Sequence, residues 1–147
     1  VMIGTSSCGL YRLKNVDAAQ SSAELVYALG QKSCAVPVVA GRYWVIAVGS
    51  LPGLIALDLA DPSHPREVSR LVLDADWMPH WLSLAPDGRR IVITGFKNMR
   101  SKILFATIDA DSGSLALTGT IDFDRAAWPH GATGAAIPHG TVFARPH

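Results

Sequence analysis

The stretch SCGLYRL at residues 7–13 returns as LPGLIAL at residues 51–57. Gly9 and Gly53 align at an offset of 44 residues (53 − 9). Each stretch follows an apolar run that ends in glycine, and each is followed by an aspartate, Asp17 or Asp61, at the same offset. Self-similarity at a fixed spacing is the sequence signature of a fold built from repeated structural units.

Further copies continue along the chain. GRYWVI at residues 41–46 is matched by GRRIVI at residues 88–93, an offset of 47 (88 − 41). WMPH at residues 77–80 is echoed by WPH at residues 128–130, where a shorter copy begins. A period of about 44–50 residues is the size of a β-propeller blade. The predicted units are approximately 1–32, 33–76, 77–127 and 128–147.

Segments within the third unit read as four strands separated by turns. Pro86-Asp87-Gly88 is a turn signal, because proline fixes φ and Asp-Gly tolerates positive φ. The strands are expected at residues 81–85, 89–94, 102–109 and 114–123, with the inner ones more apolar than the outermost. Four antiparallel strands in this order form a propeller blade. The predicted fold class is all-β, with four-stranded antiparallel propeller blades.

An α/β repeat is the alternative architecture. It requires long apolar patterns at helical spacing between the strands, and only residues 16–29 are long enough to consider. That segment could form one helical turn at residues 17–22 or a loop that leads into a strand. The connections therefore favour the all-β fold.

The units do not make a complete ring, because propellers close with about 4–8 blades. The first unit lacks its inner strand, and the last supplies only residues 128–147. Open sheet edges invite association with another chain. The expected partners are therefore the remaining blades of a larger propeller or a second copy of this chain.

Composition narrows the class of protein. Hydrophobic residues make up 49% of the 147 residues and charged residues 17%, so the chain can bury a core. The formal net charge of +1 and the absence of a basic stripe argue against a nucleic-acid partner. No apolar run reaches about 18 residues, so no membrane insertion is expected. A cytoplasmic and a periplasmic location both remain open.

Two cysteines, Cys8 and Cys34, do not make a disulfide framework. They can pair only if the fold brings them together. Free or buried thiols are the favoured interpretation, because disulfides are confined to oxidising compartments.

Candidate metal ligands precede the innermost strands. His80 and His130 each follow a proline at this place, and Cys34 occupies the related position before residues 35–38. Innermost strands line the central channel of a propeller, so these side chains would converge on its axis. Imidazole and thiolate are ligands for copper or zinc. The alternative is that they pack as structural corners beside Trp77, Trp81 and Trp128.

The other polar candidates rank lower. His139 fills the turn position that Asp87 holds in the preceding unit, so it is expected to point outward, although it could approach a neighbouring blade. His64 is expected on a surface loop and His147 is terminal. The aspartate pairs before the two Trp-Pro-His segments could orient a ligating histidine, or could be solvated loop residues. They are Asp74, Asp76, Asp122 and Asp124.

Residues 79–94 resemble the inner strands of bacterial propellers of the surface-layer and lactonase-like type. The segments WPHG at 128–131 and PHGTVF at 138–143 resemble the C-terminus of bacterial relatives of the selenium-binding protein family. That family includes methanethiol oxidases, whose channel histidines are associated with copper. The resemblance covers about half of the chain and carries over only His80 and His130, as channel ligands. The paired histidines of earlier blades would lie outside this chain.

Three functions follow as hypotheses. The first is part of a propeller with a histidine-lined metal site, which as an enzyme would be a metal-dependent oxidoreductase acting on a small thiol. The second is a non-catalytic scaffold that binds a protein or small ligand. The third is a lactonase-like hydrolase. The residues themselves establish no catalytic group.

Overall fold

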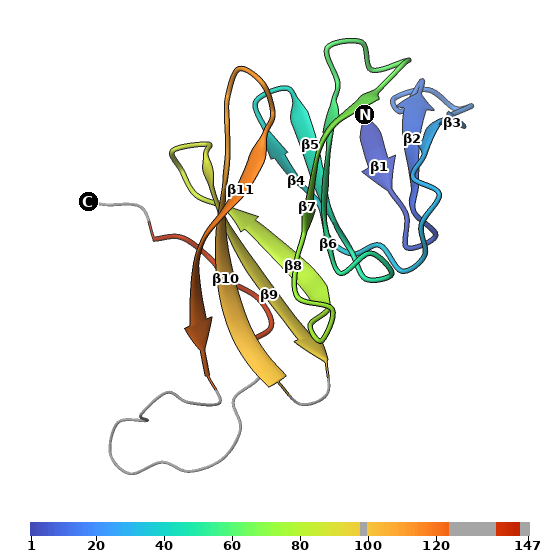
Figure 1. Ribbon diagram of the computed structural model, residues 1–147. Helices are drawn as coiled ribbons and strands as arrows, with labels where there is room; N and C mark the ends of the chain where they lie inside the picture. Colours follow the sequence, from blue (N-terminus) through green and yellow to red (C-terminus); the bar gives the residue numbers. More distant parts are fainter. Residues whose placement is uncertain (98–99, 124–137, 145–147) are drawn as a thin grey trace.

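Three antiparallel sheets stand side by side in the computed structural model (Figure 1), which describes residues 1–97, 100–123 and 138–144. The first sheet holds β1 (Met2–Gly4), β2 (Gly9–Lys14) and β3 (Ser22–Ala28). The second holds β4 (Val38–Ala40), β5 (Tyr43–Val48), β6 (Gly53–Asp58) and β7 (Arg66–Val72). The third holds β8 (Pro79–Leu84), β9 (Arg90–Lys97), β10 (Arg100–Ile108) and β11 (Leu115–Asp122). Within each sheet, every strand pairs with the strands that precede and follow it in the chain.

The second sheet is covered on both faces. Every residue of β5 and β6 is buried, in the sequences YWVIAV and GLIALD. A strand that is covered on both sides has no need of a polar face, so its apolar run is nearly continuous. The outermost strand β7 is mostly exposed and carries charged residues between apolar ones. This gradient from inner to outer strands is the one that the sequence predicts.

Two apolar cores lie between the sheets. The core between the first and second sheets contains Cys8, Leu10, Leu29, Cys34, Trp44, Ile46, Val48, Ile55 and Leu57. The core between the second and third sheets is larger. It contains Ala40, Tyr43, Val45, Ala47, Leu54, Ala56, Leu73, Trp77, Leu82, Ile91, Ile93, Leu104, Ala106 and Ile108. Alternate residues of β5 and β6 therefore serve one core or the other, as the period-2 geometry of a strand requires.

The all-β prediction is confirmed for the described residues, which contain no helix. The segment at 16–29 is a loop that leads into β3, not a helical turn. The sheets fit blade-like units, and the first has three strands where the others have four. The described residues form an open arc of sheets without a closed ring (Figure 1). The unit boundaries remain a prediction, and most of the fourth unit falls outside the described residues.

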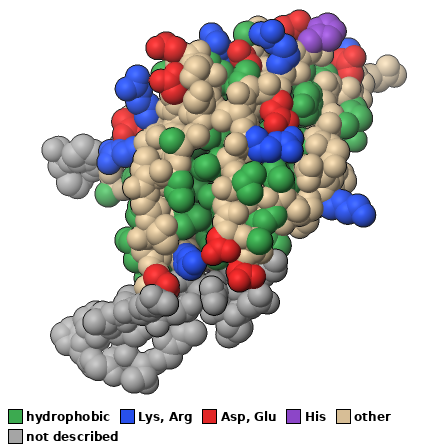
Figure 2. Space-filling view, in the orientation of Figure 1, with side chains coloured by type: hydrophobic (Ala, Val, Ile, Leu, Met, Phe, Trp, Pro, Cys, Tyr) green, Lys and Arg blue, Asp and Glu red, His purple; other side chains and the backbone are tan. Residues whose placement is uncertain are grey.

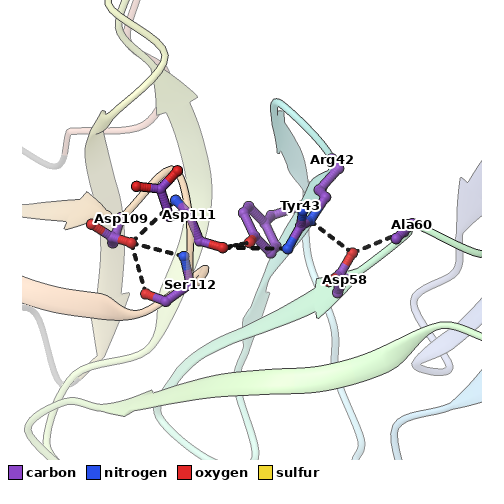
Figure 3. A network of polar contacts seen from close by, with 7 residues as sticks. All are labelled: Arg42, Tyr43, Asp58, Ala60, Asp109, Asp111 and Ser112. Atoms are coloured by element: carbon purple, nitrogen blue, oxygen red, sulfur yellow. Dashed lines mark hydrogen bonds and ion pairs between the residues drawn. The ribbon is translucent and has the colours of Figure 1, made fainter.

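A polar network joins the second and third sheets near Tyr43, the residue at which β5 begins (Figure 3). Arg42 lies with Nε 3.2 Å from Asp58 Oδ1, and its Nη2 donates to the carbonyl of Asp111 at 3.3 Å. The Tyr43 hydroxyl donates to that same carbonyl at 2.5 Å. Asp109 accepts from the amides of Asp111 and Ser112 and so shapes the turn that offers the carbonyl. Hydrogen bonds from the Ser112 amide and hydroxyl lower the pKa of Asp109.

In the turn between β8 and β9, the Asp87 carboxylate is held by hydrogen bonds and by an ion pair with Arg90. Asp87 Oδ1 accepts from the amides of Arg89 and Arg90, and Oδ2 lies 2.5 Å from Arg90 Nε. These bonds lower the pKa of Asp87 from 3.8 to about 2. A depressed folded-state pKa contributes stability that is present above the unfolded pKa and is lost as the pH falls through the folded pKa.

Asp87→Asn is therefore expected to lower the free energy of unfolding near neutral pH. The difference from the wild type should shrink between about pH 4 and pH 2, because the wild-type carboxylate becomes protonated there. Urea denaturation of both proteins across that range measures it. A difference that is independent of pH would assign the effect to the turn geometry instead of the charge.

Candidate functional site

One cavity of about 380 Å³ lies where the three sheets meet at the opposite end of β5. Three segments line it: residues 4–6 after β1, residues 33–37 before β4, and residues 78–80 at the start of β8. Cys34 and His80 are both on its wall. The structure thus brings together two of the residues that the repeat pattern placed at equivalent positions.

Backbone hydrogen bonds hold these segments to one another. The Cys34 amide donates to the Ser6 carbonyl at 3.1 Å, which ties the second unit to the first. The Val36 amide donates to the His80 carbonyl at 3.4 Å, which ties it to the third. The Gly49 amide donates to the Ser33 carbonyl at 2.7 Å. The cavity wall is therefore anchored by all three sheets.

Cys8 and Cys34 form a disulfide, so the prediction of free thiols is wrong. The bond joins the β1–β2 turn to the segment before β4, and both residues are buried in the core between the first two sheets. Residues 26 apart in the sequence become neighbours because the two sheets stack. A disulfide sulfur is not a thiolate, the form that binds metals. Cys34 could act as the predicted ligand only after reduction.

His80 has a second histidine beside it. The ring centroids of His80 and His139 are 5.1 Å apart, and the Trp81 ring lies 6.0 Å from His139. Residues 138–144 lie against β8 and β9. The Thr94 hydroxyl donates to the His139 carbonyl, and the Ser83 hydroxyl donates to the Thr141 carbonyl at 2.6 Å. These bonds to buried Thr94 and half-buried Ser83 fix the backbone that carries His139.

The outward orientation expected for His139 is therefore wrong. Its place in the repeat matched Asp87, but the chain after it lies across the third sheet instead of leaving from a strand end. Only the alternative, approach to a neighbouring blade, anticipated this contact. His130 lies outside the described residues, so its role stays a prediction.

Among the described residues, none of the remaining polar candidates lines the cavity: His64, Asp74, Asp76 and Asp122. Asp124, Trp128 and His147 lie outside the described residues. His64 is on a surface turn, as expected, with its side chain 84% exposed and Nδ1 2.9 Å from Asp61 Oδ2. Asp74 accepts from the Asp76 amide and lies 3.7 Å from Lys102 Nζ, which makes it part of a loop and an ion pair. Trp77 is buried between the second and third sheets, in agreement with a packing role.

No group of three or more His, Cys, Asp or Glu side chains is placed to hold a metal ion within residues 1–97, 100–123 and 138–144. The two imidazoles are the predicted ligands whose side chains lie next to each other in this part of the chain. His80 is half-buried and His139 is exposed, so a solute can reach the pair. The same part of the chain contains no helix with the length and apolarity needed to cross a membrane.

Solved structures with the same fold include a hypothetical selenium-binding protein from Sulfolobus tokodaii, with a TM-score of 0.61 and 15% identity over 78% of this chain. A protein from Lactobacillus plantarum matches with a TM-score of 0.63 and 16% identity over 86% of the chain. A putative 6-phosphogluconolactonase from Bacteroides fragilis matches with a TM-score of 0.51 and 12% identity over 76%. No family model and no curated protein matches the chain.

These similarities concern the fold alone, because the identities are low. They support a propeller-type architecture with selenium-binding and lactonase-like proteins among the structural neighbours. The chain spans only 34% to 38% of the length of these neighbours. This chain therefore corresponds to about a third of each of these neighbouring chains.

Proposed function

We propose that this chain is the metal-binding part of a propeller-type protein, in which His80 and His139 hold a transition metal beside the cavity. The observation that supports the proposal is the approach of the two imidazole rings, 5.1 Å between centroids. The selenium-binding and lactonase-like neighbours support only the architecture around the site.

The ring separation fits shared ligation. Two imidazoles that bind one tetrahedral metal at about 2.0–2.1 Å place their centroids about 5 Å apart. Imidazole nitrogen suits copper and zinc alike. Protein metal centres that act on substrates use about three protein ligands and keep one position open. His130 is our candidate for the third ligand, from outside the described residues.

The surroundings favour a small substrate. The cavity of about 380 Å³ is lined by His80, Met78 and Cys34 together with the hydroxyls of Thr5, Ser6 and Ser33. Its walls are therefore partly apolar and carry no carboxylate or ammonium group among the lining residues. An uncharged small molecule suits such walls better than a phosphate or a sugar acid. We accordingly prefer oxidoreductase chemistry on a small thiol, supplied by the metal, to hydrolysis of a charged lactone.

Metal titration of matched variants tests the site. The wild type is expected to bind one Cu²⁺ or Zn²⁺ in calorimetry and to retain it through dialysis, as measured by elemental analysis. His80→Ala and His139→Ala should each weaken metal binding at least tenfold. Removing a group that only hydrogen-bonds to a metal ligand already lowers metal affinity by about 10–100-fold, and these variants remove a ligand itself. His64→Ala is the matched control, since His64 is a surface residue paired with Asp61.

Two results would overturn the proposal. One is the absence of stoichiometric metal in the wild type. The other is unchanged affinity in both His80→Ala and His139→Ala. Either result would favour the non-catalytic scaffold, in which the imidazoles and Trp81 only pack together.

A further inference from the structure

The Cys8–Cys34 disulfide lies between the apolar core of the first two sheets and the cavity. Both cysteines belong to that core, but only Cys34 also lines the cavity. Cys34 is 7% exposed and Cys8 is 2% exposed. A solute that enters the cavity therefore meets Cys34 before it can reach Cys8.

Hydrogen bonds hold the backbone on each side of the disulfide without help from the S–S bond. The Cys34 amide donates to the Ser6 carbonyl at 3.1 Å. The Cys8 amide donates to the Thr5 carbonyl at 2.9 Å, and the Cys8 carbonyl accepts from the Leu29 amide at 3.0 Å. Because these bonds persist when the sulfurs separate, the two side chains stay near each other and the disulfide can close again.

A polar acceptor lies beside the sulfur that does not line the cavity. The Ser6 carbonyl oxygen is 3.9 Å from Cys8 Sγ. A disulfide sulfur has no hydrogen to donate, whereas a Cys8 thiol can donate to this oxygen. Cleavage of the S–S bond would therefore leave the buried Cys8 thiol with a partner.

The cavity wall differs in charge from the outer surface. The face shown in Figure 2 carries Lys, Arg, Asp and Glu side chains among its hydrophobic ones. None of the described residues that line the cavity is of these types, and its hydroxyl groups come from Thr5, Ser6 and Ser33. A charged solute would lose water there without gaining a counter-charge. The wall therefore favours a small uncharged solute.

We propose that the disulfide exchanges with small uncharged thiols through Cys34. The thiolate of the solute attacks Cys34 Sγ, a new S–S bond forms between them, and the bond from Cys34 to Cys8 breaks. Cys8 leaves with the electron pair as a thiolate and then takes a proton from solvent. The reverse reaction restores the disulfide and releases the solute. The step involves sulfur alone, so it does not rest on a metal at His80 and His139.

Mass spectrometry of the oxidised chain locates the adduct. The protein is incubated with β-mercaptoethanol and a metal chelator, and free thiols are blocked at early times with N-ethylmaleimide. We expect the mercaptoethanol adduct on Cys34 and the maleimide on Cys8, in about tenfold excess over the reverse arrangement. Glutathione at the same thiolate concentration, with both rates normalised to a small disulfide in solution, should react about tenfold more slowly because it is charged.

Val36→Trp tests the route through the cavity. Val36 lines the cavity and is 37% exposed, so a larger side chain there fills the cavity without entering the core. Adduct formation should slow by about tenfold, because exchange depends on access to the attacked sulfur. Val39→Trp is the matched control, since Val39 is 57% exposed on β4 and does not line the cavity. Far-UV circular dichroism and thermal melting establish that both variants are folded.

Exchange that requires unfolding would overturn the proposal. The rate would then not exceed the unfolding rate extrapolated from urea, and it would be the same for both thiols. The adduct would also be shared between Cys8 and Cys34. Absence of any adduct, or a Val36→Trp protein that reacts as fast as the wild type, would equally contradict the route. None of these results bears on the metal titration, so the two proposals can fail separately.

Discussion

Replacing Cys8 and Cys34 together by serine is expected to lower the free energy of unfolding by about 3.5 kcal/mol in the chain-entropy account of disulfides. The bond closes a segment of 26 residues, which confines the unfolded chain. It also joins the first sheet to the second at the cavity wall. Without the bond, the three-stranded first sheet is held to the second sheet only by noncovalent contacts. Urea denaturation of the oxidised wild type and of the double variant measures the difference.

Reduction supplies the control for this experiment. The reduced wild type should unfold at the same urea concentration as the double variant, and a reductant should leave the double variant unchanged. The protein must be prepared under oxidising conditions, because reducing compartments keep such thiols free. Equal stability of the oxidised and reduced wild type would contradict a stabilising role for the bond.

Gly53→Ala is expected to cost about 3 kcal/mol, at the upper end of what an overpacked core tolerates. Gly53 begins β6, directly opposite Val72 of β7. A Cβ at this position would lie 2.3 Å from the Leu71 carbonyl oxygen and 3.3 Å from Val72 Cα. Both are backbone atoms, so no side chain can rotate away and the strand pair itself must separate. Thermal or urea unfolding measures the loss.

Gly41→Ala is the matched control. Gly41 has a φ of +59°, and a Cβ there would meet nothing within 4 Å. Its cost should be confined to the left-handed backbone, about 1–2 kcal/mol. If both variants lose the same amount, then the close approach at Gly53 is not what the fold requires. The two variants together separate steric from conformational causes.

Much of the fold was predictable because a local signal and the tertiary structure agree. The third sheet is the best example. Pro86-Asp87-Gly88 supplies a turn whose carboxylate is satisfied by its own neighbours, and the strands on either side follow the predicted ranges within a few residues. The repeat of Gly9 at Gly53 also has a structural counterpart. Gly9 begins β2, and Gly53 begins β6. Turns and strand starts of this kind are set by residues that are close to one another in the sequence.

The candidate site was harder to predict because it depends on contacts between distant segments. Nothing local in the sequence shows that Cys8 meets Cys34, since the pairing arises from the stacking of two sheets. Likewise, His139 lies near His80 because Thr94 and Ser83 bind the backbone of the C-terminal segment across 45 and 58 positions. A repeat comparison aligns equivalent positions, but it does not tell which face a crossing segment will cover. The polar residues at 83 and 94 within an apolar sheet were the one available signal.

We propose that His80 and His139 share a metal beside the cavity that the three sheets line. The most direct measurement is an anomalous difference map from crystals grown with copper, collected on either side of the copper absorption edge. We predict a single strong peak between the two rings, whose centroids lie 5.1 Å apart. Crystals with copper bound elsewhere, or with none near either ring, would contradict the proposed site while leaving the fold intact.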